Sequence, residues 1–436
     1  MTPNPDLMRA IAQLNYRVTP GDVAAQAGME LQFAEQGLLT LASEVGGHMQ
    51  VSDAGELAYV FPRGMQGILQ SKYFRLRLQA AWQKVWRILF YVIRLSFGVM
   101  LIASILLIVL TIIAIFIAIN SQSREDNNNR SNNSMGRAFV PNFWIGPNWF
   151  YMFMPPGRRR VYEKQRALRG ETDLNFLEAI FSFLFGDGNP NAELEEKRWR
   201  AIATVIRNNG GVIVAEQISP YLDELGSSIS QESEDFMLPV LSRFNGRPEV
   251  SPEGGLVYRF PELQVMATEY QAKTVSAYLR ETEWEFTKAT SSQKMWAIGL
   301  GVFNMVGAIT LGALLQDPTL AAEIGGLVAF TGGIFGFLLA YAVAFLGVPL
   351  GRYFWLQGRN KSISARNELR QERAIALNQA DGDLQKKITF ASQFATRTIV
   401  SEKDLAYTTE TDLTEQEAAN KDKIDAEWAK RLEGLG

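Results

Sequence analysis

The sequence predicts a mainly α-helical integral membrane protein that carries two small α+β, winged-helix-like repeat modules. Three observations predict this class: three uncharged apolar windows, a twelve-residue internal repeat, and a composition nearly free of cysteine and histidine. The 436 residues include no cysteine and a single histidine, His48. Disulfides, thiol catalysis and cysteine-ligated clusters are therefore excluded, and a multi-histidine metal site is disfavoured. The net charge of −3 excludes a basic protein that wraps nucleic acid.

Each apolar window is long enough to cross a bilayer, which takes about 20 residues. The windows cover residues 95–119, 295–315 and 324–350. The first window begins too far into the chain to be a cleavable signal peptide. We therefore expect one transmembrane helix over 95–120 and a Gly-rich transmembrane hairpin over 294–350.

An internal repeat links residues 51–62 to residues 250–261, with seven of the twelve positions identical at a constant offset of 199. Leu57, Tyr59 and Phe61 alternate with the period of a half-buried strand, and the turn residues before them predict a β-hairpin. Three helices followed by a hairpin is the order of the winged-helix variant of helix-turn-helix modules. Three short helical patterns do precede each hairpin, at 5–17, 19–27 and 30–45, and again at 195–208, 212–222 and 231–244.

The two modules, at 1–63 and 191–262, are expected to dock proteins rather than nucleic acid. A winged helix that binds DNA presents basic and amide side chains on its third helix. Here the third pattern, 30–45, contains three glutamates and no basic residue. An acidic helix has the wrong sign for the phosphate contacts that supply non-specific affinity. No particular docking residue stands out in the sequence, and the protein partner is unknown at this stage.

The connector at 64–94 is basic and aromatic, and together with Arg63 just before it contains seven cations and no acid. We expect it to lie on an anionic lipid surface before turning into the bilayer. A solvated helix that merely flanks the span is the alternative. The second connector, 263–293, is charge-balanced, so lipid attraction is not common to both. The cations assigned to the membrane surface are Lys72, Arg75, Arg77, Lys84 and Arg87.

Basic flanks place the start of the first span and the polar tail, 351–436, in the cytoplasm. An Asn/Ser-rich loop at 121–138 leads to an aromatic segment and an amphipathic helix over 139–190. The part at 139–156 is broken by proline and glycine, so we expect it to be re-entrant or interfacial. Both modules then face the same side; the alternative puts them on opposite sides. Residues 401–436 are expected to be soluble and only loosely attached to the membrane domain.

The last two spans are rich in glycine, and Gly332 and Gly336 have the spacing that lets helices pack closely in lipid. An intramolecular hairpin is the favoured interpretation, and a homo-oligomer seam is the alternative. Asn304 is the one strongly polar side chain in these spans. Because the windows contain no charge, a channel or transporter is the weaker hypothesis.

The motif FLEAIFSFLFGDGNPN at 176–191, with Trp199, the AEQ of 215–217 and the PYL of 220–222, resembles a known family. The family consists of uncharacterised integral membrane proteins of cyanobacteria and plant chloroplasts. Some plant members carry a label for iron–sulfur cluster biosynthesis. The resemblance implies a photosynthetic membrane, either the thylakoid or the cytoplasmic membrane of a cyanobacterium, and it implies no catalytic residue.

We therefore expect a membrane-anchored scaffold or assembly factor that contacts lipids and a protein partner, such as a photosynthetic complex, and not an enzyme. No cofactor and no metal site are predicted. Asp187, Asn189 and Asn191 alternate like calcium ligands, but the downstream bidentate acid of an EF-hand is missing. The alternatives are a small-solute channel or transporter and a membrane-tethered regulator.

Overall fold

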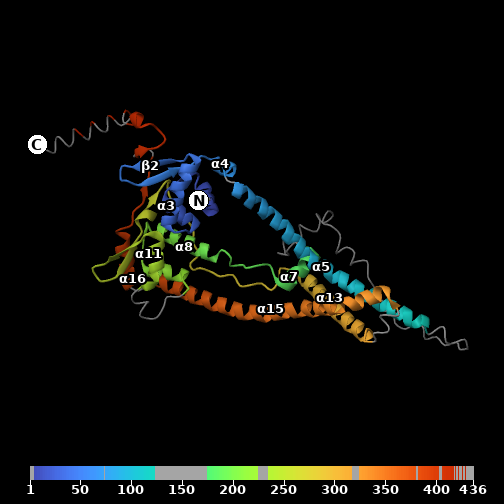
Figure 1. Cartoon of the computed structure of the whole chain (residues 1–436). Helices are drawn as coiled ribbons and strands as arrows, with labels where there is room; N and C mark the ends of the chain where they lie inside the picture. Colours follow the sequence, from blue (N-terminus) through green and yellow to red (C-terminus); the bar gives the residue numbers. More distant parts are fainter. Residues whose placement is uncertain are drawn as a thin grey trace, which may run out of the picture. The chain divides into compact units, whose positions relative to one another are not determined.

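A computed structural model describes residues 4–72, 74–122, 174–223, 234–316, 324–379, 382–401 and 405–416, and the isolated positions 418, 421, 425 and 428. The chain forms two compact units, each built from separate stretches of sequence. Unit 1 contains Met1–Ala81, Asn191–Thr282 and Ser362–Gly436, and unit 2 contains Trp82–Pro190 and Glu283–Lys361. Helices predominate, and the strands form small sheets (Figure 1).

The first module of unit 1 contains three helices and a hairpin. Thr19 caps the second helix by accepting from the backbone N–H of Asp22 at 3.0 Å, while the Asp22 carboxylate accepts from the N–H of Thr19 at 2.9 Å. This capping box, together with Pro20 at the first helical position, explains why the helix begins there. The elements are α1 (Pro5–Gln13), β1 (Arg17–Val18), α2 (Pro20–Ala27), α3 (Leu31–Val45), β2 (His48–Ser52) and β3 (Leu57–Val60).

The second module has a similar succession of elements. The predicted helix over 212–222 is wrong at its start, because Val212 and Ile213 are buried and pair with the next hairpin as a strand. The third helix is also shorter than predicted. The elements are α8 (Leu194–Asn208), β4 (Val212–Ile213), α9 (Ala215–Ile218), the 3-10 turns η4 (Ser219–Tyr221) and η5 (Asp235–Met237), α11 (Leu238–Phe244), β5 (Arg247–Val250) and β6 (Leu256–Arg259).

The two antiparallel sheets have the same strand order and register. The first runs β1-β3-β2 and the second β4-β6-β5. His48 pairs with Val60, and Arg247 pairs with Arg259, so each hairpin partner differs by the offset of 199. The inward side chains are equally buried: Tyr59 and Tyr258 are 2% and 3% exposed.

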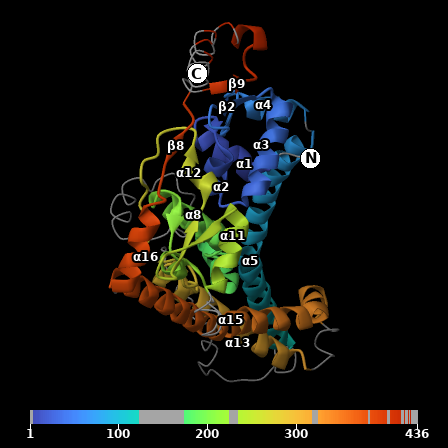
Figure 2. The same ribbon diagram turned by 90° about the vertical axis from the view of Figure 1, so that its left-hand side faces the viewer.

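The C-terminal part of unit 1 packs on both modules. The prediction of a single polar tail over 351–436 does not include this packing. Helix α16 (Gly382–Ser392) covers strands β4 and β6 with Ala391 against Val212, Val214 and Val257 (Figure 2). Strand β8 (Thr398–Ile399) pairs with β7 (Val265–Met266), which follows α12 (Pro261–Gln264). Strand β9 (Leu405–Thr408) then adds to the edge of β2, making a four-stranded sheet.

Unit 2 contains the helices that are long and apolar enough to span a membrane. They are α5 (Phe74–Gln122), α13 (Ser291–Leu314) and α15 (Gly326–Asn378), and they include most of the three predicted windows. On α5, Leu101, Ile108 and Ile115 recur every seventh residue, and all three are buried. This heptad stripe is the packing pattern of a left-handed helix bundle. A shorter apolar helix, α7 (Phe176–Phe185), packs in the same unit against α13.

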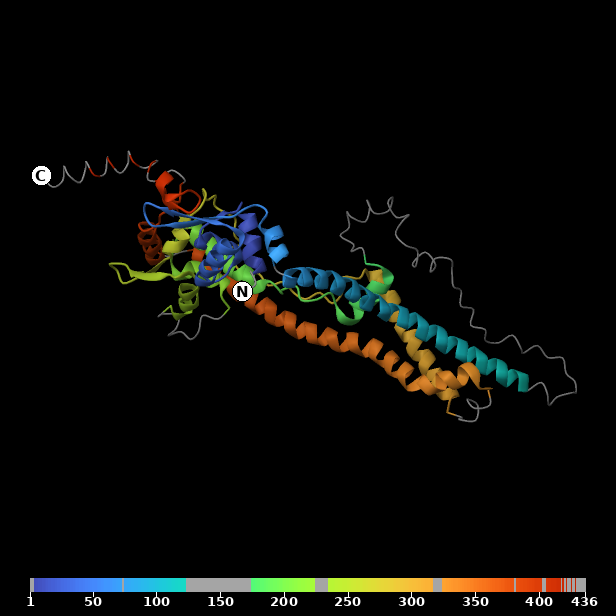
Figure 3. The ribbon, with the colours of Figure 1, turned by 45° about the horizontal axis from the view of Figure 1, so that its top comes forward.

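The predicted turn between the basic connector and the first span is wrong. After α4 (Met65–Lys72), α5 continues without a break through 49 residues, which corresponds to about 74 Å (Figure 3). This length exceeds a hydrocarbon core of about 30 Å, so part of α5 extends beyond the bilayer, and contact of that part with the lipid surface stays a prediction. The second connector, by contrast, is mostly extended between β7 and α13. The segment predicted to be re-entrant, 139–156, lies outside the described residues.

Candidate functional site: matched helix faces on a polar frame

The exposed face of α3 combines apolar and acidic side chains. Phe33 and Leu39 are 49% and 59% exposed, and they are the only exposed large hydrophobic side chains among residues 4–69. Glu35 is also exposed and lies one turn before Leu39. Exposed apolar side chains on a helix without basic residues favour contact with a protein over contact with nucleic acid.

The same face recurs in the second module at the offset of 199. Leu238 on α11 corresponds to Leu39 and is 61% exposed. The flanking positions are identical as well: Glu35 corresponds to Glu234, and Ser43 to Ser242. Buried positions on the same helices differ, since the pairs are Leu38 and Met237, Leu41 and Val240, and Val45 and Phe244. The repeat therefore keeps Glu, Leu and Ser at these three positions while its buried residues change, although the side chain of Glu234 is only 12% exposed. A comparison of the hairpins alone does not reveal this pattern.

The two faces differ in what contacts the glutamate. Glu234 accepts from the ammonium of Lys387 on α16 at 2.9 Å and from the hydroxyl of Tyr258 at 2.8 Å. Lys387 also bonds Glu216 at 2.8 Å. Burial works against the charged ammonium, but the bonds to both glutamates outweigh it and hold the pKa of Lys387 above its ordinary value. Glu35 makes no ion pair with any residue that the structure describes.

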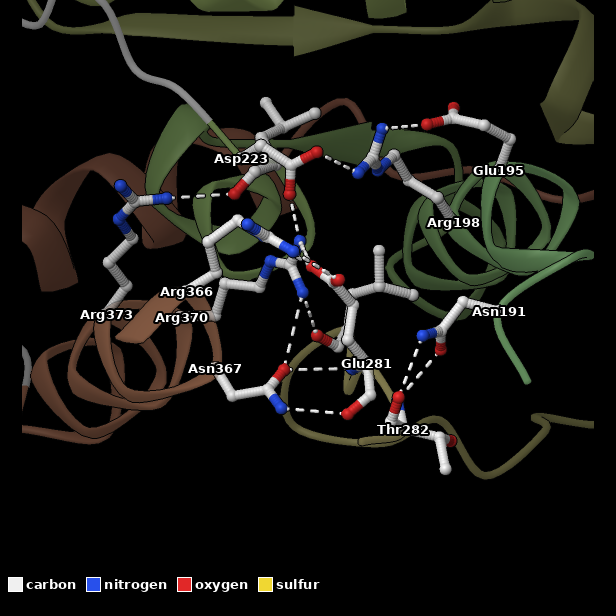
Figure 4. A network of polar contacts seen from close by, with 12 residues as sticks. Asn191, Glu195, Arg198, Asp223, Glu281, Thr282, Arg366, Asn367, Arg370 and Arg373 are labelled. Atoms are coloured by element: carbon white, nitrogen blue, oxygen red, sulfur yellow. Dashed lines mark hydrogen bonds and ion pairs between the residues drawn. The ribbon is translucent and has the colours of Figure 1, made fainter. Parts of the chain in front are cut away.

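A buried polar frame holds the second module, the connector and the end of α15 together (Figure 4). Arg370 is 1% exposed; its guanidinium bonds Asp223 and reaches Glu281 at 2.8 Å. Arg366 binds the two oxygens of Glu281 at 2.8 and 2.7 Å. The hydrogen bonds from Arg366 lead among the causes that hold the pKa of Glu281 below its ordinary value. Such a pairing keeps buried charges compensated.

The backbone of the connector is held by asparagine side chains on α15. Asn367 accepts from the N–H of Glu281 at 2.9 Å and donates to its carbonyl at 2.8 Å. In unit 2, Asn360 makes the same pair of bonds with Trp284, at 2.8 and 2.9 Å. The extended connector thus has side-chain partners where a strand would have backbone partners.

A second buried ion pair joins the two modules. Arg207 on α8 lies 2.8 Å from Asp22 on α2, with side chains 6% and 8% exposed. Arg243 on α11 donates to the carbonyl of Gly28 at 3.1 and 2.6 Å. Arg243 is the basic residue of the second module's third helix. Because its guanidinium is bonded to the Gly28 carbonyl, it is not available to bind a phosphate backbone.

The cations assigned to the membrane surface lie on α4 and α5. Lys84 and Arg87 are exposed, and Arg87 lines a shallow pocket with Trp82, Trp86 and Phe90. Lys72 ends α4, and Arg75 and Arg77 lie in the first turn of α5, but their side chains lie outside the described part of the structure. Lipid binding by this set stays a prediction.

The predicted packing glycines have open space beside them in the described part of the structure. No described atom lies within 4 Å of a Cβ built on Gly332 or Gly336. Gly301 and Gly312 take that role, since their Cβ positions lie 2.7 Å from Phe345 and 2.6 Å from Phe335. For Gly332 and Gly336, the intramolecular interpretation and the homo-oligomer seam therefore both stay predictions. The polar pairs between spans are Ser104 with Asn304 and Thr111 with Thr331, each at 2.9 Å.

The GDG turn at 186–188 is structural. Asp187 accepts from Arg94 at 3.1 Å, from Ser182 at 2.6 Å and from the backbone N–H of Lys288 at 2.8 Å. Gly186 has a φ of +82°, and a Cβ there would lie 2.7 Å from the guanidinium of Arg352. The Asp187 carboxylate thus has partners from three helices or their flanks, and no cluster of three metal-binding side chains occurs among the described residues.

Comparison with known proteins places the chain in a family. No protein-family model and no solved structure matches it. The chain is similar to an Arabidopsis thaliana protein described as uncharacterized protein At5g03900, chloroplastic, with 35% identity over 98% of this chain and 82% of the Arabidopsis protein. Similarity of this extent covers both modules and all three long apolar helices. The chain therefore belongs to the family of this chloroplastic Arabidopsis protein.

Proposed function

We propose that this protein is a membrane-anchored scaffold or assembly factor of a photosynthetic membrane, either a thylakoid or a cyanobacterial cytoplasmic membrane. Its two modules dock a protein partner through their third helices. The observation that carries this proposal is the recurrence of a Glu–Leu–Ser pattern at the third helices, at Glu35, Leu39 and Ser43 and again 199 residues later, with Leu39 and Leu238 59% and 61% exposed. The chloroplastic relative and the three apolar helices support the location.

We further propose that both modules are winged helices derived from one ancestral unit. The shared strand order, the equal hairpin register and the equally buried Tyr59 and Tyr258 support this interpretation. In such a domain the third helix is the usual contact surface. Its acidic character in the first module, and the use of Arg243 within unit 1 for the second, favour a protein ligand.

The proposal requires a partner that depends on both leucines. Tagged full-length protein is isolated in mild detergent from the membranes of its own host, as wild type and as the double variant L39A/L238A. We expect a defined set of photosynthetic-membrane proteins to copurify with the wild type and to fall at least tenfold with the double variant. L369A is the matched control, because Leu369 is 51% exposed elsewhere in unit 1. An unchanged set of proteins with L39A/L238A would contradict the docking role.

A further inference from the structure

An arginine near the end of the third apolar window rests on two tryptophan rings. The guanidinium carbon of Arg359, on α15, lies 5.2 Å from the ring centre of Trp284 and 5.4 Å from that of Trp355. The two ring centres are themselves 5.8 Å apart, so the three groups form a triangle and both rings lie to one side of the cation. Because Arg359 is exposed, its other side is open.

The N–H groups of this guanidinium have no acceptor among the residues that the structure describes. Glu283 and Glu285 flank Trp284 in the connector, yet neither of these two described acids forms an ion pair with Arg359. An arginine offers five donors in a planar fork that fits the oxygens of a phosphate or carboxylate. Arg359 therefore presents an unused anion-binding group.

Neighbouring arginines of unit 2 are used within its fold. Arg94 on α5 pairs with Asp187 at 3.1 Å. Arg352 on α15 donates to the carbonyl of Phe183 at 2.9 Å. Both of these arginines are partly buried, whereas Arg359 is exposed. Hydrogen bonding within unit 2 thus accounts for these two arginines and not for Arg359.

The Arg359 site lies at the depth of lipid headgroups. Trp355 follows the window that ends at residue 350 by five residues, which corresponds to about 8 Å along the helix. The headgroup layer extends about 5–8 Å beyond each face of the hydrocarbon core, and tryptophan is enriched there. Because helical side chains lean toward the N-terminus of their helix, Arg359 leans back onto Trp355 and toward the bilayer.

Another exposed cation flanks the same end of the helix bundle. Tyr341 donates to the carbonyl of Phe97 at 3.1 Å, and Thr331 bonds Thr111 at 2.9 Å, so α15 and α5 are antiparallel. The end of the window on α15 therefore lies at the same end of the bundle as the start of the window on α5. Arg87, exposed on α5, precedes that start, and basic flanks of this kind mark the side whose lipid leaflet is anionic.

We propose that Arg359, supported by Trp284 and Trp355, binds the phosphate group of an anionic phospholipid. The guanidinium edge donates to two phosphate oxygens, and the indole rings contact the glycerol region of the lipid. The site belongs to unit 2 alone, so it goes beyond the docking function of the two modules and does not depend on it. It is also separate from the cations predicted on α4 and α5.

Depth and charge favour this ligand over other anions. Free phosphate would fit the guanidinium but would leave the tryptophan rings without a ligand. A carboxylate of a partner protein would have to reach an arginine that leans toward the bilayer. Phosphatidylcholine carries a quaternary ammonium beside its phosphate, which Arg359 repels, so a headgroup with a net negative charge is favoured.

Native mass spectrometry of the full-length protein, released from detergent, tests this site. The probe is phosphatidylglycerol, and phosphatidylcholine with the same acyl chains is the neutral reference. We expect the wild type to bind phosphatidylglycerol at least fivefold more tightly than phosphatidylcholine, and R359Q to lose that preference. K361Q is the matched control, because Lys361 is an exposed cation on the same helix and its loss removes the same charge. R359K keeps the charge but not the fork, so its affinity should lie between those of the wild type and R359Q.

Three results would overturn the inference. One is equal binding of the two lipids by the wild type, and another is an equal loss of phosphatidylglycerol in R359Q and K361Q. The third is displacement of the lipid by millimolar inorganic phosphate, because the lipid would then contribute no more than its phosphate. If R359Q is unstable in detergent, R359K decides: since it keeps a cation against both rings, unchanged binding by R359K would reject the guanidinium fork.

Discussion

Arg370 illustrates how strongly one residue determines the order of unit 1. Its guanidinium is 1% exposed and meets Asp223 and Glu281. R370A would remove the buried guanidinium that links Asp223 to Glu281, and breaking a buried ion pair typically costs about 3–5 kcal/mol. We expect a large fall in the unfolding midpoint of unit 1, measured by thermal denaturation with intrinsic fluorescence. R366A is the control: Arg366 is 41% exposed, so its loss should cost clearly less, and equal losses would contradict the argument.

The same two acids predict a dependence on pH. The pKa values of Asp223 and Glu281 lie below their ordinary values in the folded chain, chiefly through arginine hydrogen bonds that overcome burial. A depressed folded pKa contributes stability that is present above the unfolded pKa, about 4, and is lost as the pH falls through the folded pKa. We expect the free energy of unfolding to drop below about pH 4, and to drop less in E281Q. An equal acid dependence in E281Q would contradict this.

At the scale of elements, β9 pairs with the outer edge of β2. The corresponding edge strand of the second module, β5, contains a proline. The N–H of Met49 donates to the Thr409 hydroxyl at 2.8 Å, and Thr409 donates back to the Met49 carbonyl at 3.0 Å. The position 199 residues later is Pro248, which has no N–H to donate. We expect M49P to release residues 405–416 to proteolysis while the hairpin stays paired, and M49A, which keeps the N–H, to leave them protected. Equal protection of both variants would contradict this.

The glycines on α15 give a second prediction for an element. Since the described residues leave open space beside Gly332 and Gly336, we expect a second copy of the chain to pack closely there. We expect G336L to lower the yield of crosslinked dimer in membranes at least fivefold. G299L is the control, because Gly299 on α13 has equally open space. A similar yield for both variants would indicate that these glycines face lipid.

For the whole molecule, the absence of cysteine makes topology directly measurable. The basic residues Lys84 and Arg87, with their neighbours toward the N-terminus, should hold the first module on the cytoplasmic side. In a D53C variant, an impermeant maleimide added to one side of the membrane labels the single thiol only if the first module lies on that side. Changing Lys72, Arg75, Arg77, Lys84 and Arg87 to glutamine should move part of the label to the opposite side. Unchanged labelling would show that other features determine the orientation.

The sequence predicts what local patterns encode and misses what distant contacts create. Hairpins and long helices follow from period-two and uninterrupted apolar patterns, and the structure has them at the predicted places. The pairing of the strand at 405–408 could not be predicted from local patterns, because its partner lies more than 350 residues away. Arg370 lies in a segment that reads as a polar tail, and only the fold brings it to Glu281. The exposed Leu39 and Leu238 could not be predicted for a similar reason, since exposure is a property of the folded helix.

The late position of β9 in the chain has a consequence for synthesis. Leu405 follows its partner Ser52 by 353 positions. At about 5–20 residues per second, a ribosome needs roughly 20–70 s to make that stretch. Throughout this interval the outer edge of β2 has emerged without its neighbour, and an open strand edge is a template for wrong pairing. Nascent chains of this protein should therefore depend on a chaperone during elongation, and premature stop codons near the end should aggregate more readily than their small loss of mass suggests.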